Sequence, residues 1–365
     1  MRLLWFNLAT DLDNPVLGFT TSWIREIAKL VESIQVITMR QGRVNLPKNV
    51  SISSVGKERG FTEPKRVFEF YRHLLRILHQ EHIDICFSHM IPIFSVLSFL
   101  PLKVCGIPII SWYAHGRGSS ILRLAHHLSD GMVSIDTNSY PYRVSKLTTL
   151  GHGIDTELFK PNTSTPLSDP PLILFVGRLS PIKDPLTFVR AARLLRNRHR
   201  FQVALIGPIL ERDRAYSRMV VEEIGQLRET VPTEFISGIP QDQLANWYQR
   251  CFALVHCSPS DHSLDKTVLE AMACGKLALT SSLGFEETMG KEASRLLFQA
   301  GCPHDLSTKL NSLLTLPRKD LYERGNYLRK RTIQMHSLTR LAQQLTQLFD
   351  RSIHPGAHSN PADSF

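Results

Sequence analysis

Residues 171–198 read PLILFVGRLSPIKDPLTFVRAARLLRNR, and this stretch decides the fold. A short apolar run ends at Gly177, a polar loop follows, and from Asp184 the apolar residues recur at helical spacing. The next stretch, FQVALIG at 201–207, is again a short apolar run that ends in glycine. A strand, a helix and a second strand in this order are typical of a βαβ unit, so we predict a parallel sheet.

The same alternation continues on both sides of this stretch, downstream to residue 282 and upstream from residue 2 to residue 116. Two Rossmann-like halves are therefore predicted, and 365 residues suit two domains of about 150 residues each. The fold class is α/β. The expected parts are a first domain at 1–160, a linker at 161–171, a second domain at 172–335, a helix at 336–350 and a disordered tail at 351–365.

The predicted linker, PNTSTPLSDPP, contains four prolines and five Ser, Thr or Asn residues, a composition that interrupts regular structure. Beyond residue 304 only helical patterns occur, and the last of them places Leu338, Leu341 and Leu345 on one face. No GxGxxG follows the first strand of either half, which argues against a dinucleotide-dependent dehydrogenase.

The composition restricts the class of protein further. Hydrophobic residues make up 42% of the chain, which is enough for a sizeable core, and 43 Lys and Arg against 33 Asp and Glu give a net charge of +10. Such a surface attracts phosphates, anionic lipid or nucleic acid, but the chain lacks a nucleic-acid recognition motif, so no nucleic-acid partner is expected. The six cysteines show no CxxC pair, as in reduced cytoplasmic proteins. We expect no signal peptide and no transmembrane helix.

Two segments of the second half have the residues for binding a phosphorylated ligand. Arg178 and Lys183 follow the strand that ends at Gly177, and together they can grip a diphosphate. The alternative is two solvated loop cations. The helix TVLEAMACG begins after a polar loop, where free amides can meet a phosphate, and Glu270 lies one turn into it. Glu270 either accepts hydrogen bonds from ribose hydroxyls or is an exposed helix glutamate.

Six blocks together resemble a known family. They are VGRLSPIKDPLTFVRAARLL, ALIG, FISGIP with DQLANWYQRC, HCSPS, LEAMACGK and SSLGFEE, and their order and spacing are similar to those of the family 4 glycosyltransferases. These are retaining enzymes of the GT-B fold. The resemblance implies two Rossmann-like domains that face each other across a cleft, and a C-terminal helix that crosses back to the first domain. The resemblance is specific over residues 150–320 and weaker over 1–149.

The resemblance implies a nucleotide-diphosphate sugar as donor, with no metal ion and no cofactor. Arg178 and Lys183 match the pair that binds and stabilises the leaving diphosphate, and His115 matches a histidine that faces the donor sugar. Glu270 matches the glutamate that holds the ribose. The other implied donor-binding residues are Gly18, Gly177, His262, Ser263, Asp265, Lys266, Gly284 and Glu287. Asp11 and Asp13 spell the DxD metal motif of another fold, which we interpret as loop polarity.

The chain departs from the family pattern eight residues before Glu270, where His262 replaces a glutamate that normally touches the donor sugar. His262 can still bond a hydroxyl, or Asp261 or Asp265 can supply the carboxylate. Ser263, Asp265 and Lys266 form a Ser-x-Asp-Lys loop that is expected to reshape the sugar pocket. The alternative function is a catalytically inactive nucleotide-sugar-binding protein that acts as a partner or regulator.

The implied activity is a retaining, metal-independent hexosyltransferase that serves cell-surface polysaccharide or glycolipid synthesis, with a glycan or a lipid-linked acceptor. Residues 40–80 carry nine basic and three acidic side chains. The segment 57–79 is therefore a candidate surface for docking on an anionic membrane. The alternative is an ordinary sheet-packing helix with a solvated basic face. We expect a cytoplasmic protein, peripheral at the inner face of the membrane.

Overall fold

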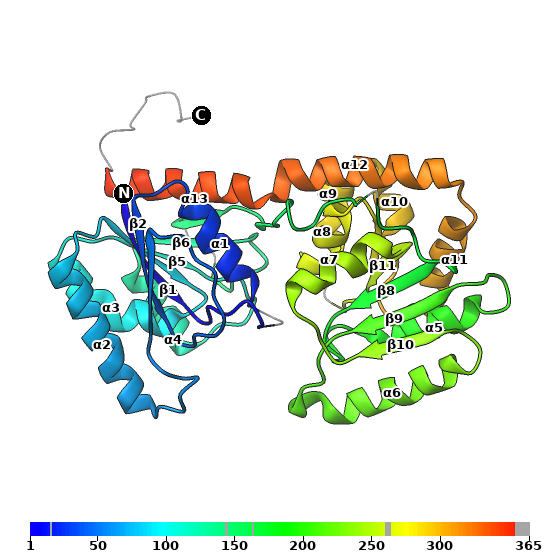
Figure 1. The fold of residues 1–365 in the computed structure, drawn as a ribbon, viewed down its shortest axis with the longest axis horizontal. Coiled ribbons are helices and arrows are strands. Elements are labelled where there is room, and N and C mark those ends of the chain that lie inside the picture. Colours follow the sequence, from blue (N-terminus) through cyan, green and yellow to red (C-terminus); the bar gives the residue numbers. More distant parts are fainter. Residues whose placement is uncertain (15–16, 143–144, 163, 260–263, 355–365) are drawn as a thin grey trace. The chain divides into compact units, whose positions relative to one another are not determined.

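The computed structural model describes residues 1–14, 17–142, 145–162, 164–259 and 264–354. The chain forms two compact units, one from Met1–Gly153 together with the segment from Leu338 on, the other from Ile154–Ser337. Each unit is built on its own parallel sheet flanked by helices (Figure 1). None of the described helices is long and apolar enough to cross a membrane. The chain thus leaves the first unit once and returns to it with its last helix.

The boundary between the units differs from the predicted linker at 161–171. Phe159 is fully buried in the core of the second unit. Gln249 donates a hydrogen bond to the Lys160 carbonyl (2.9 Å), and Ser168 N donates to the Arg250 carbonyl (3.0 Å). The proline-rich stretch therefore belongs to the second unit. Prolines prevent regular structure there, but they do not keep the segment from packing.

The first unit has seven parallel strands in the order β3-β2-β1-β4-β5-β6-β7. The central strand β1 is apolar on both sides from Leu3 to Phe6 because helices cover both faces of a parallel sheet. The strands are β1 (Arg2–Asn7), β2 (Ser33–Thr38), β3 (Val50–Ser54), β4 (Ile85–His89), β5 (Ile109–Trp112), β6 (Gly131–Ser134) and β7 (Leu147–Thr149).

Helices α2 (Glu63–Gln80), α3 (Pro92–Val104) and α4 (Ser120–Leu128) cover one face of this sheet, and α1 (Phe19–Ile27) and α13 (Leu338–Ile353) cover the other (Figure 1). Alternation along β1 separates the two cores. Leu4 packs in a cluster with Phe70 of α2, whereas Trp5 packs in a cluster with Leu341 of α13. The apolar face predicted for the last helix is thus the face that anchors it to the first unit.

The second unit has five parallel strands in the order β10-β9-β8-β11-β12. The strands are β8 (Leu172–Val176), β9 (Gln202–Ile206), β10 (Thr233–Ile236), β11 (Ala253–His256) and β12 (Leu277–Thr280). The chain first moves outward from β8 to β10 and then returns to β11 on the other side of β8. In open sheets of this type, the ligand crevice lies at the carboxyl ends of the strands where the order reverses, which here are those of β8 and β11.

In the described part of this unit, eight α-helices and three short 3₁₀ helices surround the sheet. The α-helices are α5 (Pro185–Leu195), α6 (Arg214–Arg228), α7 (Gln241–Arg250), α8 (Lys266–Ala273), α9 (Glu286–Met289), α10 (Ala293–Leu296), α11 (Pro303–Leu314) and α12 (Arg318–His336). The 3₁₀ helices are η1 (Glu211–Asp213), η2 (Leu283–Phe285) and η3 (Gly290–Glu292).

Two glycines let α12 pack against the end of α8. Gly275 ends α8 with a φ of 73°, a left-handed conformation that glycine adopts at little cost. A Cβ on Gly325 of α12 would lie 2.0 Å from the Gly275 carbonyl oxygen. Arg329, one turn further along α12, donates to the carbonyls of Ala273 and Phe159. Helix α8 is thereby fixed at its carboxyl end.

We expect Gly325→Ala to lower the free energy of unfolding by about 2 kcal/mol or more, because the added methyl group collides with backbone that cannot rotate away. Gly225 of α6 is the matched control, since it is also helical but has no atom within 4 Å of an added Cβ. Gly225→Ala is expected to raise stability by roughly 0.5–1 kcal/mol. Urea unfolding of both variants checks this, and equal effects would contradict the close approach.

Candidate functional site

The loop after β8 is held in place by its own backbone and by α6. Leu179 N donates to the Pro208 carbonyl (3.2 Å), and Ser217 Oγ donates to the Leu179 carbonyl (2.7 Å). Asp184 in this loop has a left-handed backbone, with a φ of 40°. Asp184 starts α5 and accepts a hydrogen bond from Thr187 Oγ1 (2.6 Å), which offsets the strain of its backbone.

Lys183 lies in this loop and forms an ion pair with Asp265 at the beginning of α8. Both side chains are largely buried, with 20% and 17% of their surfaces exposed. Asp265 also caps α8, because its Oδ1 accepts from Thr267 N (3.1 Å) and Thr267 Oγ1 (2.8 Å). One carboxylate therefore joins the loop after β8 to the N-terminus of α8, at the crevice between β8 and β11.

The charges around Asp265 favour its ionised form. Burial opposes ionisation, but the Lys183 ammonium and His256 outweigh it and hold the pKa of Asp265 well below its usual range. His256 Nε2 lies 3.5 Å from Asp265 Oδ2, and its Nδ1 is 3.0 Å from Thr280 Oγ1. Burial lowers the pKa of His256, while the nearby Asp265 carboxylate opposes this shift.

Glu270 lies inside α8 and is only 4% exposed, which differs from an exposed helix glutamate. Its two carboxylate oxygens accept hydrogen bonds from Tyr248 Oη and Gln241 Nε2, both at 3.0 Å. Burial raises the pKa of Glu270 to about 7, above the ordinary 4.5. Burial also lowers the pKa of the neighbouring Lys266 well below its usual range. The N-terminal half of α8 therefore contains titratable groups in an apolar setting.

Gln241 and Tyr248 orient Glu270, and the sequence alone assigned no role to either residue. Both stand on α7, seven residues apart, and their side chains reach α8 from the same side. The block DQLANWYQRC contained both, but only the fold shows that this helix lies against α8. The available signal in the sequence was that Gln241 and Tyr248 are seven residues apart, a spacing that places both on one side of a helix.

The remaining predicted residues of the second unit lie on neighbouring loops. Arg178 is half-buried, and its guanidinium has no polar partner within the described part of the chain. Gly284 lies in η2 and Glu287 in α9, the segment that follows β12, and the Glu287 side chain is exposed. His262 and Ser263 lie outside the described residues.

A serine joins the loops after β11 and β12. Ser281 Oγ accepts from Ser258 N and donates to the Ser258 carbonyl, both at 2.8 Å. Because the two strands are parallel neighbours, their carboxyl ends share one edge of the sheet. The loops after β8, β11 and β12 are therefore anchored at the same edge.

Two predicted residues belong to the first unit. Gly18 starts α1, and a Cβ there would lie 2.8 Å from the Asn14 carbonyl oxygen, so the tight loop requires glycine. His115 follows β5, is exposed, and accepts a hydrogen bond from Arg117 N through Nδ1 (3.1 Å). Their roles toward a donor stay predictions.

The DxD residues contact the protein itself. Asp13 forms an ion pair with Arg43 (2.7 Å), and Asp11 Oδ1 accepts from Arg43 N (3.1 Å). Among the described residues, no group of three or more His, Cys, Asp or Glu side chains is arranged to hold a metal ion.

Buried Asn7 organises the loop after β1, since its amide donates to the Ala9 carbonyl (2.7 Å) and to Thr10 Oγ1 (2.9 Å).

Residues 158–332 match the family model described as glycosyl transferases group 1. Among curated proteins, the chain is 32% identical over 178 residues to the D-inositol 3-phosphate glycosyltransferase of Frankia alni, which is 45% of this chain and 44% of that protein. It is 30% identical over 158 residues to the enzyme of the same name from Kribbella flavida, 40% and 37% of the two chains. The chain thus spans less than half the length of the curated relatives it matches.

Solved structures resemble the chain almost throughout. HepE of Anabaena, solved in complex with UDP, has a TM-score of 0.72 at 15% identity and covers 96% of this chain and 100% of its own. A sucrose-phosphate synthase of Thermosynechococcus elongatus has a TM-score of 0.73 at 14% identity, with 96% and 99% coverage. These likenesses confirm the predicted fold class, the two-domain α/β fold named GT-B.

Glu270 has a testable effect on stability. Its folded-state pKa of about 7 lies above its ordinary value of 4.5, so the folded protein binds the proton more tightly than the unfolded chain. Its contribution is therefore present below pH 4.5 and is lost as the pH rises to about 7, up to about 3 kcal/mol in all.

We expect the free energy of unfolding of the wild type, relative to Glu270→Gln, to fall by about this amount between pH 4.5 and pH 8. The variant provides the control, because every other titrating group is common to both proteins. Parallel pH profiles would show that Glu270 titrates normally.

Proposed function

We propose that this chain is a retaining glycosyltransferase that moves a sugar from a nucleotide-diphosphate donor to a glycan or lipid-linked acceptor. The observation that carries the proposal is the pairing of Lys183 with Asp265. It brings a cationic loop to a helix N-terminus at the crevice of a five-stranded parallel sheet. This arrangement lies within the residues that match the glycosyltransferase family model.

The donor diphosphate suits the charges at this edge of the sheet. Arg178 has a guanidinium with no partner among the described residues, so both of its outer nitrogens are available for a bidentate contact with phosphate. The Lys183 ammonium has three N–H donors, and Asp265 uses only part of this capacity. HepE of Anabaena, which shares this fold, was solved with UDP-glucose.

In the proposed reaction, the bond between the sugar carbon and the diphosphate oxygen breaks while the acceptor oxygen bonds to the same face of that carbon. The acceptor proton passes to an oxygen of the departing diphosphate. Arg178 and Lys183 stabilise the negative charge that develops on this leaving group, without a metal ion. Asp265 holds the Lys183 ammonium in position, so little reorganisation is needed as the charge develops.

Glu270 serves the nucleotide in this proposal. Each of its oxygens has accepted one hydrogen bond and retains a second lone pair, which can accept from a ribose hydroxyl. His262, Ser263, Asp265 and Lys266 line the altered sugar pocket, and Gly18, His115, Gly284 and Glu287 complete the donor contacts. We also propose a cytoplasmic location, because the six cysteines are free thiols.

A ligand screen tests the proposal and identifies the donor. The melting temperature is measured with UDP-, GDP-, ADP- and CMP-sugars, because a ligand that binds only the folded state raises it. One of these donors is expected to produce a clear rise. The anomeric configuration of the product, read by proton NMR, then decides whether transfer proceeds with retention. No rise with any donor would overturn the proposal.

The two cations should respond differently to mutation. Arg178→Ala is expected to change the free energy of unfolding by less than about 0.5 kcal/mol, because the guanidinium has no protein partner to lose. Lys183→Ala is expected to cost about 3 kcal/mol, because it leaves the Asp265 carboxylate buried without its ammonium. Both variants should lose the thermal response to the donor.

Arg190→Ala on α5 is the matched control, since it removes an exposed arginine that pairs with Glu223 (3.4 Å). It should retain donor binding and transfer. Near-normal turnover by purified Arg178→Ala would contradict the role given to the diphosphate contact.

A further inference from the structure

Helices α2, α3 and α4 of the first unit expose large apolar side chains to solvent. Among the described residues of this unit, seven of the eight exposed large apolar side chains lie on these three helices. Phe68 is 66% exposed, Leu100 69% and Val104 80%. We call this set the apolar face: Val67, Phe68, Leu75, Leu100, Val104, Ile121 and Leu124. Single exposed apolar residues are ordinary, but a group on adjacent helices marks an interaction surface.

The three helices are neighbours on one face of the sheet. Tyr71 Oη of α2 donates a hydrogen bond to the Leu97 carbonyl of α3 (3.0 Å), and α3 packs against α4 (Figure 1). Leu100 and Val104 are four residues apart on α3, so both lie on its exposed side.

Basic side chains border the apolar face. Residues 57–128 contain nine Lys and Arg against five Asp and Glu. Lys65, Arg72 and Arg76 lie on the side of α2 next to Phe68, and all three are exposed. Lys103 on α3 and Arg123 on α4 add to them.

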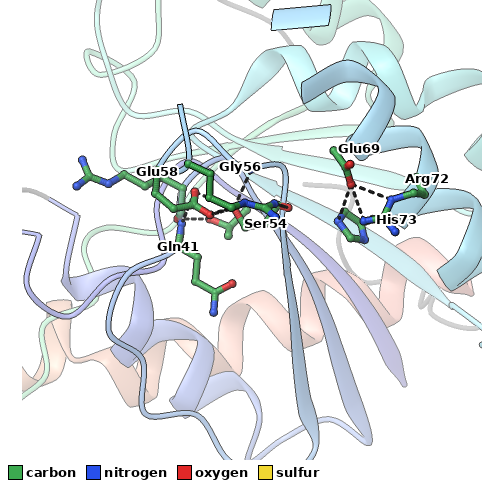
Figure 2. A network of polar contacts seen from close by, with 10 residues as sticks. Gln41, Ser54, Gly56, Glu58, Glu69, Arg72 and His73 are labelled. Atoms are coloured by element: carbon green, nitrogen blue, oxygen red, sulfur yellow. Dashed lines mark hydrogen bonds and ion pairs between the residues drawn. The ribbon is translucent and has the colours of Figure 1, made fainter. Parts of the chain in front are cut away.

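Two of the five acidic side chains, those of Glu58 and Glu69, have polar partners within the first unit, as Figure 2 shows. Glu58 accepts from Ser54 Oγ (2.8 Å) and from Gln41 N (3.3 Å). Glu69 is bound by Arg72 (2.6 Å) and lies 3.7 Å from His73. The ion pair with Glu69 offsets the charge of Arg72, and residues 57–128 as a whole keep an excess of basic side chains.

We propose that the apolar face and its basic border dock on the surface of an anionic lipid bilayer. Phe68, Leu100 and Val104 enter the boundary between headgroups and acyl chains, while Lys65 and Arg76 lie near the headgroup phosphates. An exposed apolar group flanked by positive charge matches an anionic bilayer in both respects, whereas a neutral protein partner would not require the charge. This surface goes beyond the proposed sugar transfer, and its test needs no nucleotide sugar.

Vesicle flotation tests the docking. The purified chain is mixed with vesicles of phosphatidylcholine alone or of equal parts phosphatidylcholine and phosphatidylglycerol, at low and high salt. Binding is expected only to the anionic vesicles and should weaken with salt. The double variants Phe68→Ser/Leu100→Ser and Lys65→Glu/Arg76→Glu should each bind about tenfold more weakly.

The second unit supplies matched controls. Met219→Ser/Val221→Ser removes two exposed apolar side chains of α6, and Arg212→Glu/Arg214→Glu reverses two exposed charges. Both controls should bind like the wild type, and circular dichroism should show all four variants folded. Equal binding by the face variants and the controls would overturn the proposal.

A fluorescent label tests which part of the chain contacts the bilayer. Cys105 is exposed directly after Val104, whereas Cys302 is half-buried and the other four cysteines are buried. In a Cys302→Ser background, an environment-sensitive dye on Cys105 should shift to the blue on anionic vesicles. A dye on Met219→Cys in a Cys105→Ser/Cys302→Ser background should not shift. If the blue shift instead occurs without vesicles, together with self-association, the proposal of bilayer docking is overturned. The apolar face then binds a second copy of the chain.

Discussion

The site depends on one ion pair, between Lys183 after β8 and Asp265 at the start of α8. The two residues are 82 positions apart, and their contact joins two loops at the point where the strand order of the second sheet reverses. A largely buried pair of this kind contributes little net stability, because desolvation offsets its attraction. Its value is geometric, since it holds an ammonium beside the carboxyl ends of β8 and β11, and its carboxylate caps helix α8.

Helix α8 shows how environment separates two carboxyl groups of one short helix. Asp265 stays ionised because Lys183 and His256 outweigh its burial. Glu270 has only neutral hydrogen-bond donors, Tyr248 and Gln241, on its oxygens, so burial dominates and raises its pKa to about 7. Neighbouring groups whose pKa values are shifted in opposite directions are typical of functional sites. The close contact between Gly275 and Gly325 keeps this helix in place from its other end.

The two units resemble known proteins in different ways. The family model matches residues 158–332 and so falls wholly within the second unit, where the residues proposed to bind the diphosphate lie. The first unit resembles solved structures in fold, and its own residues give it a distinct surface. One face of its sheet is closed by α1 and α13, whose apolar residues are buried, whereas the helices on the other face leave Phe68, Leu100 and Val104 in solvent.

The sequence by itself determined the fold class, because short apolar runs alternating with amphipathic helices allow few arrangements other than two parallel sheets. It also indicated Arg178, Lys183 and Glu270 as candidates. It did not predict edge strand β3, whose residues are only partly buried and form no apolar run. The boundary between the units and the contact of Lys183 with Asp265 were decided by tertiary structure alone. Periodicity reports which side of an element is buried, but not which distant element buries it, and burial is what sets the charge of Glu270.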